Sequence, residues 1–129
     1  MRGTVKFFDK VKGWGFITDS DGKDVFVHWT NIVMDRFRYL DEDDIVNFDV
    51  GIGNDGRQQA INVTPILTMR MIKDSLKEDN LHIVTMEDAY GVTMYQVSDQ
   101  NNVLQFSEQG MSFLELAEYA GFEVHQVSA

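Results

Sequence analysis

Two short segments near the start of the chain alternate aromatic with aliphatic or small residues, and this pattern constrains the fold more than any other feature. They are Lys-Gly-Trp-Gly-Phe-Ile at residues 12–17 and Val-Phe-Val-His-Trp at residues 25–29. Because successive side chains on a β-strand point to opposite faces, Trp14 and Phe16 share one face while Ile17 lies on the other. Each segment therefore predicts a strand with an aliphatic face toward a core and an aromatic face toward solvent.

The outward aromatic face suggests a ligand. Phe26 and His28 of the second segment extend the row of rings, and the valines between them face the predicted core. An ordinary core is the alternative interpretation of the rings, but the valines and Ile17 already supply one. Unpaired nucleobases are the commonest flat partner of such a row, and each stacked base contributes ~1–3 kcal/mol.

Short β-rich segments separated by turn residues predict five strands in the first half of the chain. The predicted strands cover residues 4–8, 13–18, 24–28, 45–50 and 58–63. Asp-Ser-Asp-Gly at residues 19–22 is a turn, because its short polar side chains can bond their own backbone and glycine accepts a positive φ. Five short strands with such turns predict a small closed barrel, which leaves few sheet edges open.

Residues 67–129 predict a small α+β unit, and the only proline, Pro65, lies where the sequence changes character. Apolar residues spaced three and four apart predict a helix over 67–78. Three β-rich segments predict a meander, with strands at 81–86, 92–97 and 103–106 and turns at 88–91 and 99–102.

A second helix and a last strand complete the predicted unit. Ser112 and Glu115 have the spacing of a capping box, in which each side chain satisfies a helix-end amide of the other. The helix is predicted to run to about Ala120 with Gly121 as its C-terminal cap, and residues 123–127 predict a strand.

The composition is that of a globular protein. The 129 residues, 43% of them hydrophobic and 12% aromatic, give room for one ordinary domain or two very small ones. There is no apolar run long enough for a transmembrane helix and no signal-peptide core. The absence of cysteine excludes disulfides and thiol chemistry. We therefore expect a cytoplasmic protein with no membrane contact.

The net charge of −10 is uneven. Residues 1–66 hold eight Lys/Arg and eleven Asp/Glu, whereas residues 67–129 hold three and ten, for net charges of −3 and −7. Phosphate binding requires cations, so this balance disfavours tight capture of duplex DNA. It permits binding led by stacking with modest electrostatic help.

The first half resembles the cold-shock domain family, whose fold is a five-stranded oligonucleotide-binding barrel. The resemblance rests on five segments that match the family's strands and its two ribonucleoprotein motifs. They are residues 3–9, 12–17, 24–29, 40–42 and 62–64. The chain is thus expected to be mainly β, with a cold-shock domain at residues 1–66 and a small α+β domain of unknown role at residues 67–129.

The resemblance implies which residues bind nucleic acid. Those expected to stack on bases are Phe7, Trp14, Phe16, Phe26, His28, Trp29 and Phe37, with Phe8 at the edge. Those expected to accompany the backbone are Lys6, Lys12 and Arg38. The chain departs from the family pattern at Asp9, where asparagine is common, and at Trp14 and Trp29, where phenylalanine is usual. Residues 56–62 are longer by about one residue, which leaves the role of Arg57 open.

We predict neither catalysis nor a metal or cofactor site. His28 could be a general base or a ligand, but those roles need a positioned partner or several further ligands. Residues 19–22 lack the ligand order of a calcium loop. The acidic run at residues 41–44 is best explained as a solvated loop.

The predicted function is binding of single-stranded RNA or DNA with low sequence specificity, as in an RNA chaperone or a regulator of gene expression. The alternative hypothesis is a protein-interaction module in residues 67–129. That acidic half would dimerise, dock a protein partner or fold over the barrel as a mimic of nucleic acid.

Overall fold

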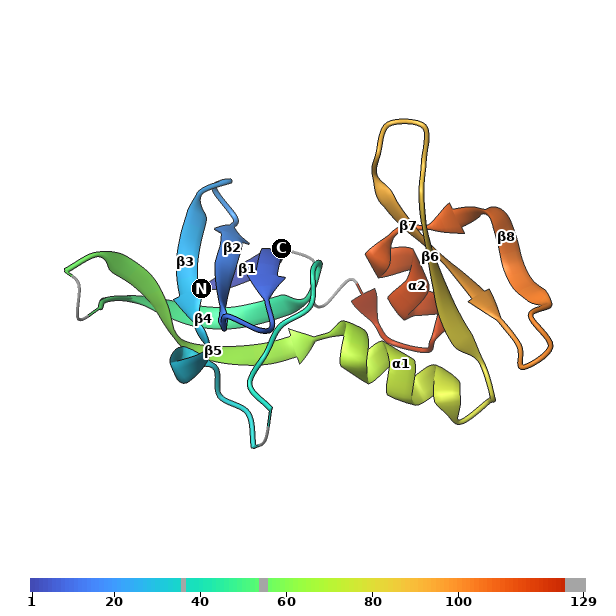
Figure 1. The fold of residues 1–129 in the computed structure, drawn as a ribbon, viewed down its shortest axis with the longest axis horizontal. Coiled ribbons are helices and arrows are strands. Elements are labelled where there is room, and N and C mark those ends of the chain that lie inside the picture. The colour runs from blue at the N-terminus through green and yellow to red at the C-terminus, as the bar shows by residue number, and fades with distance from the viewer. Residues whose placement is uncertain (36, 54–55, 125–129) are drawn as a thin grey trace. The chain divides into compact units, whose positions relative to one another are not determined.

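The computed structural model describes residues 1–35, 37–53 and 56–124, and the chain divides into two compact units (Figure 1). The first unit covers Met1–Met69 and the second begins at Arg70. The first is a closed barrel with the strand order β1-β2-β3-β5-β4. Its elements are β1 (Arg2–Asp9), β2 (Trp14–Asp19), β3 (Asp24–His28), the 3-10 helix η1 (Trp29–Asn31), β4 (Ile45–Ile52) and β5 (Gln58–Leu67).

The alternating pattern predicted this barrel and its inward face. Ile17 and Val27 are fully buried in a core that also contains Val5, Phe48 and Val63. Complete burial of an aliphatic side chain stabilises a fold by about 1.5–3 kcal/mol. These side chains therefore fix the register of β2 and β3, because a slip by one residue would exchange the two faces.

The close pairing of β1 with β2 depends on a glycine and a bulge. The register changes between Val5 and Phe7, so Lys6 is the extra residue of β1, and Phe7 lies opposite Phe16. A Cβ atom on Gly15 would lie 2.1 Å from the carbonyl oxygen of Phe7. Only glycine allows the two backbones to approach this closely.

Three hairpin turns are built in the same way. In each, an aspartate carboxylate accepts the backbone N–H groups of the residues two and four places on, at 2.8–2.9 Å. The fourth residue of each turn has a positive φ of 62–82°. The aspartates are Asp19, Asp88 and Asp99, and the fourth residues are Gly22, Gly91 and Asn102. The three turns predicted at these positions are confirmed.

The second unit contains a three-stranded antiparallel sheet with the order β6-β7-β8. Its strands are β6 (His82–Glu87), β7 (Thr93–Ser98) and β8 (Leu104–Met111), and its helices are α1 (Met69–Lys77) and α2 (Phe113–Tyr119). Helix α2 contacts β7 and β8. The buried residues of this unit include Tyr95, Val97, Met111 and Leu116.

Helix α2 begins with the predicted capping box. Ser112 Oγ accepts the N–H of Glu115 at 3.2 Å, and Glu115 Oε1 accepts the N–H of Ser112 at 3.1 Å. Both bonds satisfy helix-end donors that would otherwise have no partner. The prediction of the cap and of the helix is confirmed.

Several predicted boundaries were wrong by a few residues. Strand β5 continues through Pro65 to Leu67. Its register with β4 shifts between Ile45 and Val46, directly beside Pro65, and an irregular pairing tolerates a proline. Helix α1 accordingly begins at Met69. Strand β8 extends to Met111, five residues past the predicted end.

The strand predicted over residues 123–127 is not present at 123–124, which lie outside any strand. The rest of that segment falls outside the described residues.

One carboxyl group in the barrel unit is buried. Asp44 is 2% exposed, and its two oxygens accept the backbone N–H groups of Asp41 at 2.8 Å and Met69 at 2.7 Å. Burial raises the pKa of Asp44 to about 7, although the two hydrogen bonds oppose this rise. The nearby Lys10 forms an ion pair with Asp41 and lies 4.7 Å from the ring centre of Tyr39. The acidic run at residues 41–44 is therefore not a fully solvated loop, because Asp44 is buried and hydrogen-bonded to the backbone.

Candidate nucleic-acid interface

Strands β1, β2 and β3 place four aromatic rings in one cluster, which we call the ring cluster: Phe7, Trp14, Phe16 and Phe26. Trp14 is its centre, with ring centroids 5.7 Å from Phe7, 6.1 Å from Phe16 and 6.2 Å from Phe26. The rings of Trp14 and Phe26 are nearly parallel, at 27°, whereas Phe16 meets both edge-on. Edge-on and offset contacts are the favoured geometries of aromatic pairs. The cluster is thus ordered by its own contacts.

The members of the ring cluster are only partly covered. Phe7 is 45% exposed, and Trp14, Phe16 and Phe26 are half-buried. Their neighbours Ile17 and Val27 are fully buried. The rings therefore lie on the outer face of the barrel, where a flat ligand can reach them.

His28 and Trp29 continue the aromatic surface at the end of β3. Their ring centroids are 5.8 Å apart, and His28 Nδ1 is 2.8 Å from Thr30 Oγ1. Trp29 is 43% exposed, and its ring covers Gly13, where a Cβ atom would lie 2.4 Å from Trp29 Cδ1. The backbone N–H of Trp29 also donates to the carbonyl of Gly13 at 2.8 Å. The orientation of Trp29 therefore depends on a glycine sixteen residues earlier.

A cavity of about 300 Å³ lies beside the ring cluster. Phe16 and Phe26 form its apolar wall, and the remaining lining residues are Asp24, Arg57, Gln58 and Gln59. Its walls offer carboxylate, guanidinium and amide groups next to the half-buried rings. This combination suits a base that stacks on a ring and presents its polar edge.

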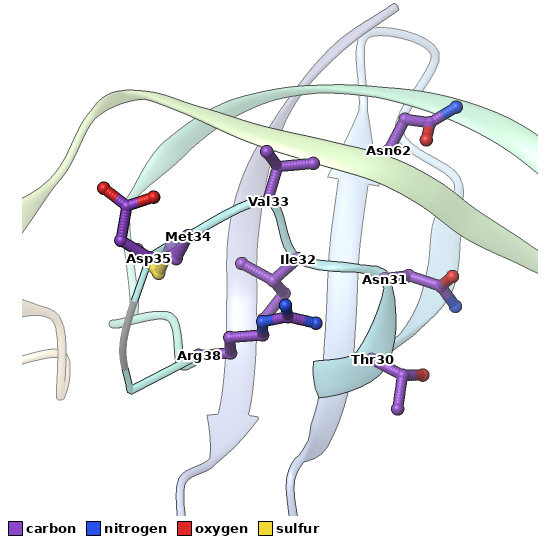
Figure 2. A pocket seen from close by; sticks show the side chains of 8 residues that line it. All are labelled: Thr30, Asn31, Ile32, Val33, Met34, Asp35, Arg38 and Asn62. Carbon is purple, nitrogen blue, oxygen red and sulfur yellow. The ribbon is translucent and has the colours of Figure 1, made fainter.

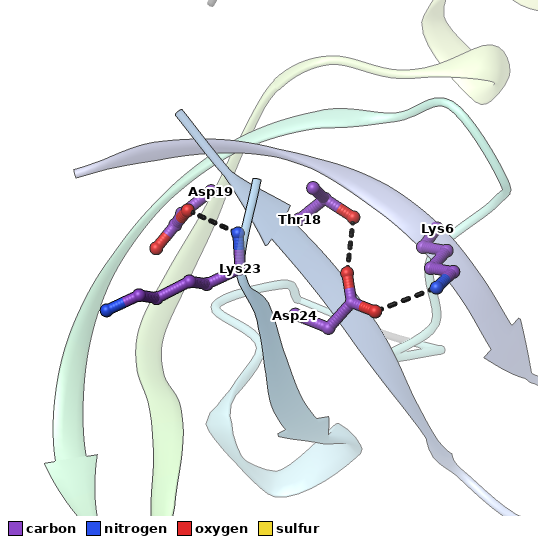
Figure 3. Close-up of polar contacts among 5 residues, drawn as sticks. All are labelled: Lys6, Thr18, Asp19, Lys23 and Asp24. Carbon is purple, nitrogen blue, oxygen red and sulfur yellow. Dashed lines mark hydrogen bonds and ion pairs between the residues drawn. The ribbon is translucent and has the colours of Figure 1, made fainter. Parts of the chain in front are cut away.

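One cation of this face is paired within the domain. Lys6 Nζ lies 2.7 Å from Asp24 Oδ2, and Thr18 Oγ1 donates to Asp24 Oδ1 at 2.8 Å (Figure 3). The hydrogen bonds from Lys6 and then Thr18 lower the pKa of Asp24 below its ordinary value. Asp24 thus remains charged and partly neutralises Lys6.

A second cavity, of about 360 Å³, lies around the segment that follows η1. Figure 2 shows Arg38 and the residues from Thr30 to Asp35 around it, with Asn62 contributed by β5. Thr30 connects this cavity to His28 through their hydrogen bond. Arg38 therefore lies near the end of the aromatic surface.

Three further predicted site residues lie apart from the ring cluster. Phe8 is half-buried and packs against the barrel core, so its first role is structural. Phe37 is 79% exposed and belongs to the connection between η1 and β4. Lys12 is exposed in the β1–β2 turn, where its backbone N–H donates to Asp9 Oδ1 at 2.9 Å.

Several residues of the site were not predicted from the sequence. Asp24 and the glutamines of β5 line the first cavity, because Val27 of β3 pairs with Ala60 of β5 across more than thirty residues of chain. Gly13 and Thr30 support Trp29 and His28. Asp9, one of the departures from the family pattern, closes the turn by accepting the N–H groups of Val11 and Lys12.

The described residues show no metal-binding group and no membrane-spanning helix. No three His, Cys, Asp or Glu side chains among them are arranged to hold a metal ion. No helix in the described ranges is long and apolar enough to cross a membrane.

The model of the "cold-shock" DNA-binding domain matches residues 1–66, the same residues that form the barrel and carry the rings. The chain belongs to the cold-shock domain family. This confirms the resemblance predicted from the two aromatic segments and the mainly β fold with its closed barrel. Nucleic-acid binding in general is the activity that the family supports.

Two bacterial relatives are little longer than the cold-shock domain itself. The chain is 52% identical over 60 residues to a cold shock-like protein of Thermotoga maritima, a match that covers 46% of this chain and 91% of that protein. It is 51% identical over 59 residues to cold shock protein CspC of Bacillus subtilis, covering 46% of this chain and 89% of the relative.

A plant relative is longer. The chain is 52% identical over 64 residues to cold shock domain-containing protein 4 of Arabidopsis thaliana. That match covers 49% of this chain but only 32% of the plant protein. The similarity in all three relatives is thus confined to about half of this chain.

Proposed function

We propose that the cold-shock domain of this chain binds single-stranded RNA or DNA by base stacking, with low sequence specificity, and acts as an RNA chaperone or a regulator of gene expression. The exposed ring cluster on β1, β2 and β3 carries the proposal, because it combines partly exposed aromatic faces with an adjacent polar cavity. We propose as its contact residues Lys6, Phe7, Phe8, Lys12, Trp14, Phe16, Phe26, His28, Trp29, Phe37 and Arg38.

Stacking supplies most of the expected binding energy. Each base stacked on an aromatic side chain contributes ~1–3 kcal/mol, so three or four stacked bases outweigh the repulsion from a domain of net charge −3. A π-face is common to all four bases, which explains the low sequence specificity. Few phosphates are neutralised, so affinity should fall only weakly with salt, at about −0.7 in log–log slope per phosphate contact.

Fluorescence titration tests the proposal. A pyrimidine-rich oligonucleotide is added to the full chain at low salt, and the emission of Trp14 and Trp29 is followed. We expect quenching, and we expect the Phe16→Ala/Phe26→Ala double variant to lose at least tenfold in affinity, a change of about 1.4 kcal/mol. Tyr90→Ala is the control, because Tyr90 is 91% exposed on the second unit. Equal affinities of the double variant and the wild type would overturn the proposal.

The chaperone role has its own test. A protein that holds strands unpaired should open a weak RNA hairpin labelled with a fluorophore and a quencher at its ends. We expect the wild-type chain to raise the fluorescence of this hairpin and the Phe16→Ala/Phe26→Ala variant to do so much less. Tight oligonucleotide binding without hairpin opening would leave the binding function and remove the chaperone role.

A further inference from the structure

Among the described residues, the main helix contacts of the sheet β6-β7-β8 are those of α2 with β7 and β8. The side chains of Tyr95 and Val97 are 3% and 0% exposed, which places the buried face of β7 toward α2. Met94 and Gln96 alternate with them and point to the opposite face. Their partners across the β6–β7 pair are Met86 and Val84. We call this opposite side the outer face.

The outer face is mainly apolar, although Gln96, His82 and Ser98 also lie on it, and its methionines make it adaptable. Val84 of β6 is 39% exposed. Leu104 of β8, which pairs with Ser98 of β7, is 36% exposed, while Met86 and Met94 are half-buried. A Cβ atom on Gly110 would lie 2.9 Å from Met94 Cβ and 3.2 Å from Met86 Sδ. The methionines therefore pack into the space beside a residue without a side chain, and methionine repacks readily around a partner.

The apolar surface continues beyond the strands. Val92 and Val103 flank the two turns of the sheet and are 53% and 55% exposed. Strands β6 and β8 each pair only with β7 in the described part of the chain. Exposed apolar side chains gathered in one sheet and its turns are candidates for an interaction site.

Apart from its histidines, the stretch that contains the outer face has ionisable side chains of one sign. Residues 78–129 contain nine Asp and Glu side chains and no Lys or Arg. The three cations of the second half, Arg70, Lys73 and Lys77, all belong to α1. Asp88 and Asp99 directly follow strands β6 and β7. A mainly apolar, methionine-containing face in a strongly acidic stretch of the chain complements a partner that is apolar on one side and positively charged around it.

We propose that the outer face of the β6-β7-β8 sheet binds a basic amphipathic protein segment, a helix with an apolar stripe flanked by Lys and Arg. A second copy of this chain fits less well, because it would bring together two halves that each carry a net charge of −7. Nucleic acid is disfavoured for the same reason. The proposal assigns this half a partner of its own, independent of the ring cluster.

A labelled peptide tests the proposal on the full chain. The probe has leucine at helical positions i, i+3, i+4 and i+7 and lysine elsewhere; a scrambled peptide of the same composition and a peptide with Glu in place of Lys are the controls. We expect binding of the amphipathic basic probe, weakened by salt. Val84→Lys should lower its affinity at least tenfold, while Val50→Lys should not. Val84 and Val50 are matched, since both are strand valines 39% exposed.

Methionine methyl resonances locate the bound probe. We expect the methyl signals of Met86 and Met94 to shift on titration, while that of Met34, which packs against the barrel core, stays in place. Equal affinity of Val84→Lys and Val50→Lys, or equal binding of the Glu peptide, would overturn the proposal. Sedimentation of the peptide-free chain gives a further test. The proposal would also be overturned if the wild type sedimented as a dimer and Val84→Lys as a monomer, because a second copy of the chain would then occupy the outer face. Oligonucleotide quenching measured in the same variants reports separately on the ring cluster.

Discussion

Lys6 Nζ and Asp24 Oδ2 lie 2.7 Å apart beside the ring cluster, so a cation proposed to follow the nucleic-acid backbone is already paired within the domain. Bound phosphate must compete with Asp24 for Lys6. Asp24→Asn removes that competition and one negative charge. We therefore expect tighter oligonucleotide binding and a salt slope steeper by about 0.7 in log–log terms.

Asp21→Asn is the control for this change. Asp21 is exposed in the turn of the same hairpin and its removal alters the net charge by the same amount. Equal effects of the two variants on affinity and salt slope would show that only the overall charge matters and that the ion pair does not.

Gly15→Ala should destabilise the barrel strongly. The new methyl group would lie 2.1 Å from the carbonyl oxygen of Phe7 and 2.7 Å from Phe8 Cα, and backbone atoms cannot move aside without breaking the β1–β2 pairing. We expect a loss of about 1–3 kcal/mol or more in urea unfolding. Gly22→Ala separates this clash from backbone strain, because its Cβ would meet nothing within 4 Å although φ is +82°. A smaller loss in Gly15→Ala than in Gly22→Ala would contradict the packing argument.

Asp44 should make the stability of the barrel depend on pH. Its pKa is raised from 3.8 to about 7 by burial, so the folded state binds this proton more tightly than the unfolded chain. The stabilising contribution is complete below pH 3.8 and is lost as the pH rises through about 7. The shift sets an upper bound of roughly 4 kcal/mol on this loss.

Urea unfolding from pH 4 to pH 8 measures the contribution of Asp44 when wild type is compared with Asp44→Asn. The amide loses one accepting oxygen at every pH, which lowers stability by a constant amount. The difference between the free energies of unfolding of wild type and Asp44→Asn should therefore shrink, or change sign, as the pH rises. Parallel pH profiles would show that Asp44 does not titrate in this range.

Ser112→Ala should weaken the second unit. It removes the hydroxyl that accepts the N–H of Glu115 at the start of α2, and loss of such a cap costs about 1 kcal/mol. We expect a lower unfolding midpoint for the α-helical circular dichroism signal. Ser20→Ala, in an exposed turn of the barrel unit, should leave that midpoint unchanged; an equal shift in both variants would exclude the cap as the cause.

The strands and the rings could be predicted from the sequence because both follow from local alternation. Trp14 and Phe16 lie two residues apart on one strand, and the pairing of β2 with β3 brings Phe26 beside them. The capping box of Ser112 and Glu115 is equally local. Each of these features needs only the residue spacing within one strand, hairpin or helix turn.

The remaining features depend on contacts between distant segments. The hydrogen bond between Asp44 and Met69 joins residues 25 apart in the sequence. The ion pair between Lys6 and Asp24 joins β1 to β3 across β2. Strand β5 passes Pro65 because β4 pairs with it irregularly, which no single segment reveals. The helix-facing and outer faces of the β6-β7-β8 sheet differ in burial rather than in residue type, so the pattern alone could not tell them apart.

The three aspartate-closed turns bear on how the chain folds. Each joins neighbouring strands within a few residues, and hairpins of this size form in about 1–10 μs. Barrel closure instead requires Val27 to meet Ala60 and Gly3 to meet Val46, and such distant pairings form slowly because of loop-closure entropy. We therefore expect stopped-flow mixing to show a sheet in the second half that forms before the barrel closes, with the connection between η1 and β4 setting the slower rate.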